Sequence, residues 1–114
     1  MTILVTGATG RVGRHVIQQL VQRGAAVRAL TRDPSKAEVP AGVEVVRGDF
    51  LDIDSLRSAF NGVRTLFLLN AVAGDEFTQA LIALNIARES GVGRVVYQSV
   101  MHADRSVKIG RAHV

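Results

Sequence analysis

The feature that most constrains the fold is a run of three glycines, spaced three residues apart, near the amino terminus. It reads TGATGRVG over residues 6–13, after a short β-branched stretch and before apolar residues at helical spacing. A strand, a glycine turn and a helix in this order form a seat for a diphosphate. Gly7 lets the chain turn sharply, Gly10 lets the backbone approach the ligand, and Gly13 lets the helix pack on the strand. No Gly-Lys-Ser/Thr follows, which argues against a nucleoside-triphosphate loop.

Strands and helices alternate along the rest of the chain. The patterns predict helices over 11–23, 52–60 and 75–90, and strands over 2–6, 26–31, 43–47, 64–69 and 94–99. Asp33 before Pro34 predicts a capped short turn. Alternation of this kind is typical of an α/β, Rossmann-type three-layer sandwich. We expect five parallel strands in the order 3-2-1-4-5, with a ligand crevice between strands 1 and 4.

The chain has 114 residues, which predicts a single domain over 1–114. Its strand-helix core covers 1–99, and residues 100–114 show no clear period and read as an irregular tail. In the last helix, Phe77, Leu81 and Leu84 form one apolar row.

Composition excludes several classes of function. The net charge is +4, but the 14 basic residues are scattered, whereas a nucleic-acid interface requires clustering. No cysteine is present and the three histidines lie far apart, so no metal site is expected. No stretch resembles a signal peptide or a membrane span, which points to the cytoplasm and to no membrane partner.

The end of the second predicted strand bears on which dinucleotide is bound. An NAD site places a carboxylate there for the ribose hydroxyls, whereas a 2′-phosphate requires a cation. The sequence offers Arg32, with Arg11 in the nearby glycine loop, and two guanidiniums suit one phosphate. Asp33 could accept from a ribose hydroxyl, but its place before Pro34 favours a cap. The pattern therefore favours NADP over NAD, with a solvated Arg32 as the alternative.

Four motifs together resemble one family. They are TGATGRVG, ALTRDP after the second strand, VxxVxGDFxD after the third, and RVVYQSV followed by HAD at the fifth. Over about residues 1–106 the chain resembles the N-terminal half of the atypical short-chain dehydrogenases/reductases, the NmrA-like and NAD(P)H:quinone oxidoreductase-like proteins.

The resemblance implies roles for particular residues. The glycine loop would bind the pyrophosphate, Asp49 and Phe50 would border the adenine, and the end of the fourth strand would pass the ribose toward the nicotinamide. From the residues alone, Asp49 could instead cap the next turn, and the Asn70 side chain could hydrogen-bond the backbone of its own turn. The full predicted cofactor set is Gly7, Ala8, Thr9, Gly10, Arg11, Val12, Gly13, Arg32, Asp49, Phe50, Leu69, Asn70 and Ala71.

Catalytic residues are harder to assign. Most of the superfamily uses a tyrosine followed four residues later by a lysine, but the residue four after Tyr97 is Met101. Tyr97 lies inside a strand and reads as a packing residue. Ser99 at the strand end and His102 beyond it are the remaining candidates, His102 because imidazole titrates near neutral pH.

Two functions follow from these observations. One is an NADPH-dependent oxidoreductase for quinone-like or small carbonyl acceptors, or its cofactor-binding half. The other is an NmrA-like redox sensor that binds the dinucleotide without turnover. The resemblance implies that the chain is truncated relative to the family, which should leave Leu66, Leu68, Val96 or their neighbours uncovered and favour a homo-oligomer.

Overall fold

Short apolar stretches form the strands, and stretches with helical spacing form the connections between them. The computed structural model describes residues 2–8, 10–70, 76–99 and 108–112. The elements are β1 (Thr2–Val5), α1 (Arg11–Gln22), β2 (Ala26–Thr31), a 3-10 turn η1 (Pro34–Lys36), β3 (Glu44–Arg47), α2 (Ile53–Phe60), β4 (Val63–Asn70), α3 (Glu76–Ser90), β5 (Arg94–Ser99) and β6 (Lys108–Ala112).

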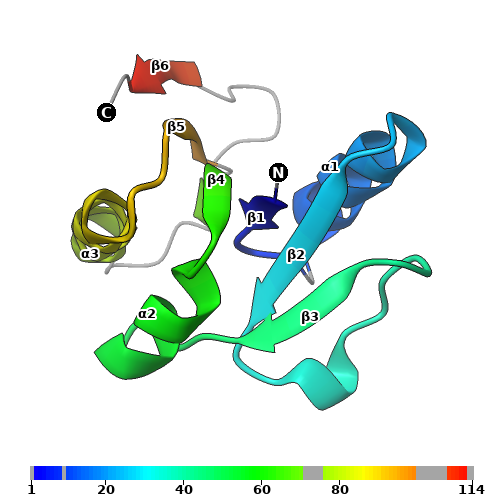
Figure 1. Cartoon of the computed structure of the whole chain (residues 1–114), viewed down its shortest axis with the longest axis horizontal. Coiled ribbons are helices and arrows are strands. Elements are labelled where there is room, and N and C mark those ends of the chain that lie inside the picture. Colours follow the sequence, from blue (N-terminus) through cyan, green and yellow to red (C-terminus); the bar gives the residue numbers. More distant parts are fainter. Residues whose placement is uncertain (1, 9, 71–75, 100–107, 113–114) are drawn as a thin grey trace.

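The first five strands are parallel and lie in the order β3-β2-β1-β4-β5 (Figure 1). Val5 at the end of β1 pairs with Ala29 on one side and Phe67 on the other. The predicted Rossmann-type sheet and its strand order are therefore confirmed. The carboxyl ends of β1 and β4 meet where the strand order reverses, which is where such sheets bind ligands.

The carboxyl-terminal residues differ from the prediction of an irregular tail. Residues Lys108–Ala112 form β6, which pairs antiparallel with β5 and extends the sheet to six strands (Figure 1). The segment reads KIGRA and lacks both alternation and β-branched density, so its pattern gave no strand signal. The unpaired edge of β5 supplies the hydrogen bonds, and an edge is a property of the sheet.

The two faces of the sheet are covered unequally (Figure 1). Helices α2 and α3 cover one face, where Leu66 and Leu68 of β4 are fully buried with Leu56 and Phe60 of α2. The expectation that Leu66 and Leu68 would be uncovered is therefore wrong, because alternation along β4 points them at α2 and α3.

The opposite face of the sheet packs against α1. Its buried cluster contains Val5, Ile17 and Val27, and Phe67 lies half-buried beside it. Val96 of β5, the register partner of Phe67, is also only half-buried. The less covered apolar residues thus lie on the α1 face, and self-association through them stays a prediction.

Helix α3 buries a different row from the one its largest apolar residues suggest. Ala83, Ile86 and Ala87 are buried against the sheet, whereas Leu81 is 46% exposed. Small side chains here let the helix approach the strands closely. Among the helices of the described residues, none combines the length and apolar character needed to cross a membrane.

Arg28 of β2 fixes the position of α2. Its Nη1 donates to the carbonyl oxygens of Ala59 and Asn61, both at 2.7 Å, at the carboxyl end of α2. Its Nε donates to Glu44 Oε1 of β3 at 2.9 Å. Since the last carbonyls of a helix have no partner within the helix, the guanidinium satisfies them and ties α2 to the sheet.

Candidate functional site

The carboxyl ends of the central strands border a cleft with a volume of about 1250 Å³. Typical small-ligand clefts occupy roughly 300–1,000 Å³, so this one can take an extended molecule. Its lining comes from the glycine loop, the ends of β2 and β4, the turn before α2, and α3. The lining residues are Gly7, Ala8, Gly10, Arg11, Val12, Gly13, Leu30, Thr31, Arg32, Asp33, Lys36, Gly48, Asp49, Phe50, Leu51, Leu69, Thr78, Gln79 and Ile82.

Most of the predicted cofactor residues share this cleft. Thr9, Ala71 and His102 lie outside the described residues. Asn70 ends β4 and Ser99 ends β5, and the two are register partners across adjacent strands. Tyr97 packs against the apolar cluster under α2 and α3, as its place in the strand predicted.

A side chain at each of the three loop glycines would have a different structural consequence. Gly7 has φ of +62°, a conformation that favours glycine. A Cβ at Gly13 would overlap the carbonyl oxygen of Gly7 and lie 2.8 Å from its carbon. At Gly10 φ is −78°, and a Cβ would meet nothing nearer than 3.4 Å. Folding therefore requires glycine at 7 and 13, whereas at 10 a Cβ would fill space that faces the cleft.

The amino terminus of α1 is suited to an anion. No described side chain caps it, and its first turn contains no acidic residue. By contrast, Asp52 caps α2 by accepting a hydrogen bond from the Ser55 amide. Because the first amides of a helix lack internal partners and carry partial positive charge, those of α1 can bind a diphosphate. The residues present fit a dinucleotide.

Thr6 holds the two central strands together at the floor of the cleft. It is 2% exposed, and its Oγ1 accepts from the Leu69 amide at 2.9 Å and donates to the Leu69 carbonyl at 3.2 Å. Its amide donates to the Phe67 carbonyl at 3.0 Å. These bonds tie the end of β4 to the start of the glycine loop.

The loop after β2 places cations at the rim of the cleft. Arg32 and Lys36 both line it and are both exposed. Asp33 lies between them, and its Oδ1 accepts from the amide and hydroxyl of Ser35 at 3.2 and 2.6 Å. Its Oδ2 lies 3.9 Å from Lys36 Nζ. Asp33 thus caps η1, as its place before Pro34 predicted.

A tight turn between β3 and α2 forms another part of the rim. The amide of Asp52 donates to the Asp49 carbonyl at 2.8 Å, and the Asp49 amide donates to Ser55 Oγ at 2.9 Å. Asp49 Oδ1 accepts from the Leu51 amide at 2.9 Å. The carboxylate of Asp49 therefore shapes its own turn, and Asp49 also lines the cleft.

The sequence patterns did not indicate several of the lining residues. Lys36 could have been found, because it lies four residues after Arg32 in the same short charged segment. Leu51 and the α3 residues Thr78, Gln79 and Ile82 gave no such signal. Their place depends on how α2 and α3 pack on the sheet.

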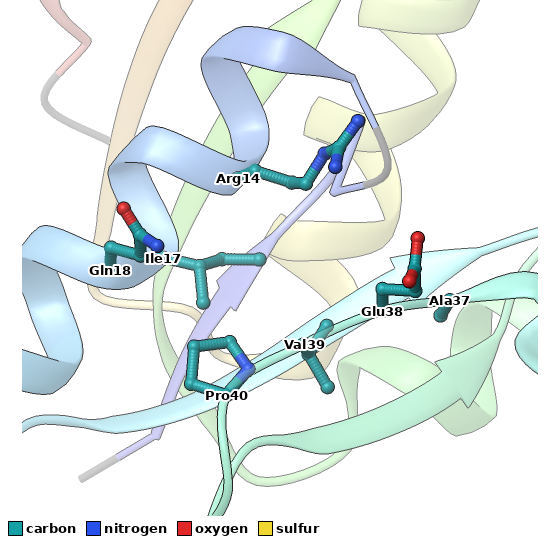
Figure 2. A pocket seen from close by; sticks show the side chains of 7 residues that line it. All are labelled: Arg14, Ile17, Gln18, Ala37, Glu38, Val39 and Pro40. Carbon is teal, nitrogen blue, oxygen red and sulfur yellow. The ribbon is translucent and has the colours of Figure 1, made fainter.

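A second, smaller groove of about 670 Å³ lies between α1 and residues 37–40. Figure 2 shows Arg14, Ile17 and Gln18 on α1, with Ile17 pointing toward the segment that carries Val39 and Pro40. Its two charged side chains, Arg14 and Glu38, have opposite signs, and no glycine amides line it. The groove is therefore a poor anion site, and the larger cleft is the candidate site.

Comparison with known proteins agrees with this geometry. A family model described as NAD(P)H-binding matches residues 7–113. Quinone oxidoreductase 2 of Escherichia coli K12 is 37% identical over 109 residues, which cover 91% of this chain and 38% of that protein.

Solved structures give the same picture. The triphenylmethane reductase of Citrobacter sp. complexed with NADP(H) superimposes with a TM-score of 0.78 at 36% identity, covering 85% of this chain and 36% of that one. The Escherichia coli NADPH-dependent quinone oxidoreductase QOR2 complexed with NADPH gives 0.78 at 36% identity, covering 90% and 38%.

The chain spans somewhat more than a third of the length of these relatives, the share that contains the glycine loop. The resemblance to the N-terminal half of quinone oxidoreductase-like and NmrA-like reductases is confirmed. With the match running from residue 7 to residue 113, this chain belongs to the NAD(P)H-binding family.

Proposed function

We propose that this chain is the NADP(H)-binding part of an oxidoreductase that acts on quinone-like or other small carbonyl acceptors. The observation that carries the proposal is the loop after β2, which presents Arg32 and Lys36 to the cleft while Ser35 and Lys36 occupy the carboxylate of Asp33. A 2′-phosphate requires cations at this place, and Arg32 and Lys36 together outnumber the single carboxylate of Asp33.

The relatives support the same choice. The Citrobacter reductase was solved with NADP(H) and the Escherichia coli quinone oxidoreductase with NADPH. In this chain Arg32 would bind the 2′-phosphate, with Lys36 and Arg11 as further cations at the rim. The first amides of α1 would hold the pyrophosphate, and Asp49 Oδ2 would accept from the adenine amino group.

The acceptor class rests on the relatives' names and on the missing tyrosine-lysine pair. The cofactor supplies the hydride when bound, and quinone-type acceptors require little acid assistance. Ser99 ends β5 beside Asn70 at the carboxyl edge of the sheet, the edge where the substrate would lie. We propose Ser99, with His102 as the second candidate, as the residue closest to the reacting atoms.

Calorimetric titration with NADP⁺ and NAD⁺, alongside NADPH oxidation with a panel of quinones, tests the proposal. We expect NADP⁺ to bind more tightly than NAD⁺. We expect NADPH oxidation only if this chain contains the whole reactive site. Tight NADP⁺ binding without turnover would favour the redox-sensor alternative, or a cofactor-binding part that needs the remainder of the relatives' length. Equal affinity for both nucleotides would contradict the NADP assignment.

A further inference from the structure

Leu51 exposes more of its side chain than its apolar character explains. It is 94% exposed, and Leu81 at 46% is the other exposed large apolar residue among those described. Leu51 lines the rim of the cleft, at the tip of the turn between β3 and α2. Its neighbour Phe50 is half-buried and packs against the cluster beneath α2, so only one of these two apolar side chains contacts the core.

The exposed Leu51 does not lie in a loop that lacks hydrogen bonds. The turn is closed by the Asp52–Asp49 backbone bond at 2.8 Å, and the Leu51 amide is held by Asp49 Oδ1 at 2.9 Å. Ser55 anchors the start of the turn through the Asp49 amide. An apolar side chain is therefore held in solvent by a fully bonded turn, where it contributes nothing to the stability of the fold.

Part of the cleft beside this turn is apolar. Leu30 is 4% exposed, and Phe50 and Ile82 are half-buried. These residues offer a flat aromatic ring an apolar surface within the cleft. A ring seated on that surface would keep one face hydrated unless a side chain from the rim covered it.

Resting on the proposed function, we propose that Leu51 packs on the outer face of the adenine ring and contributes to its binding. The same turn then contacts the adenine in two ways. Asp49 Oδ2 accepts from its amino edge, and Leu51 covers its face. The hydrogen bond from the Leu51 amide to Asp49 Oδ1 keeps these two contacts in register, so one local structure recognises both features.

The test compares Leu51→Ser with Leu81→Ser, which removes the other exposed leucine from α3. NADP⁺ and adenosine 2′,5′-bisphosphate are titrated by calorimetry, and inorganic pyrophosphate by amide NMR shifts. We expect Leu51→Ser to weaken both adenine ligands about fivefold, the effect of exposing roughly half a leucine. Pyrophosphate binding and the thermal midpoint should not change, Leu51→Met should restore affinity, and Leu81→Ser should bind normally.

Unchanged affinity of Leu51→Ser for adenosine 2′,5′-bisphosphate would overturn the inference and leave the proposed function intact. So would a change in sedimentation at unchanged NADP⁺ affinity, since Leu51 would then contact a second copy. Equal weakening of pyrophosphate would assign the residue a general structural role and also overturn the inference. Failure of the unaltered chain to bind NADP⁺ at all would overturn the proposed function together with this inference.

Discussion

Two neighbouring loops at the same edge of the sheet differ in how the fold constrains them. The glycine loop, residues 6–13, lies against backbone, and a Cβ at Gly13 would overlap the Gly7 carbonyl. The charged loop, residues 31–36, is exposed over most of its length, and the Lys36 side chain is 83% exposed. One loop is packed against the fold, and the other stands clear of it.

The difference separates two tasks in nucleotide binding. In the proposed function, the glycine loop would form the seat for diphosphate, which NAD and NADP share, from backbone that also holds α1 on the sheet. The charged loop carries the side chains that would distinguish NADP from NAD, and the core does not depend on them. Changes at Gly7 and Gly13 of the first loop should therefore affect folding, and changes at the cations of the second loop should affect the choice of nucleotide.

Gly13→Ala should have the largest effect. The added methyl meets backbone, which cannot rotate away, so α1 must shift and the free energy of unfolding should fall by about 3 kcal/mol. Urea denaturation measures the change. Gly24→Ala is the control, since a Cβ there meets nothing within 4 Å and only the positive φ is strained. If Gly13→Ala were no less stable than Gly24→Ala, the packing argument would be wrong.

Arg32→Ala should come next. It should weaken NADP⁺ binding by about 1.5–3 kcal/mol, the range for hydrogen bonds to charged groups, and leave NAD⁺ nearly unaffected. Calorimetry with the two nucleotides measures the difference, and the stability of the protein should stay constant because Arg32 is exposed. Equal losses of affinity for both nucleotides would mean that Arg32 does not bind the 2′-phosphate.

Gly10→Ala sharpens the comparison within the glycine loop itself. Its backbone conformation suits any residue and its Cβ would meet nothing nearer than 3.4 Å, so stability should change little. The methyl would lie where the diphosphate must approach, and NADP⁺ and NAD⁺ should both weaken by about tenfold, or about 1.4 kcal/mol. Retained affinity for both nucleotides would mean that the diphosphate does not lie against Gly10.

Lys36→Ala should have the smallest effect. The ammonium is exposed and Asp33 lies 3.9 Å away, so its contribution to NADP⁺ binding should be roughly 0.2–1 kcal/mol. The loss should shrink at high salt because exposed charges are screened. A calorimetric series in sodium chloride checks this, with Lys36→Arg as the control that keeps the charge. A loss as large as that of Arg32→Ala would make Lys36 the principal phosphate ligand.

Local patterns carried most of the fold and much of the candidate site. Residues 26–31 and 94–99 are short stretches rich in apolar residues, and the strands there match the prediction residue for residue. Asp33 before Pro34 predicted a cap that the hydrogen bonds to Ser35 confirm. The glycine spacing and Arg32 marked the cleft without any knowledge of packing.

Other features could not be read from local patterns. The uncovered residues predicted on β4 were on the wrong face, because the direction in which a strand's alternation points depends on which helices cover each side. Strand β6 depends on the free edge of β5, and the position of Leu51 on the cleft rim depends on how Arg28 and Ser55 hold α2 and its preceding turn.

The sequence by itself determined the order of elements, the diphosphate seat and the cation beside it, since each depends on residues within a few positions of one another. The tertiary structure decided which face is buried, where the sixth strand pairs and which side chains from α2 and α3 reach the cleft. Those features require residues far apart in the chain to meet, and only the packed sheet brings them together.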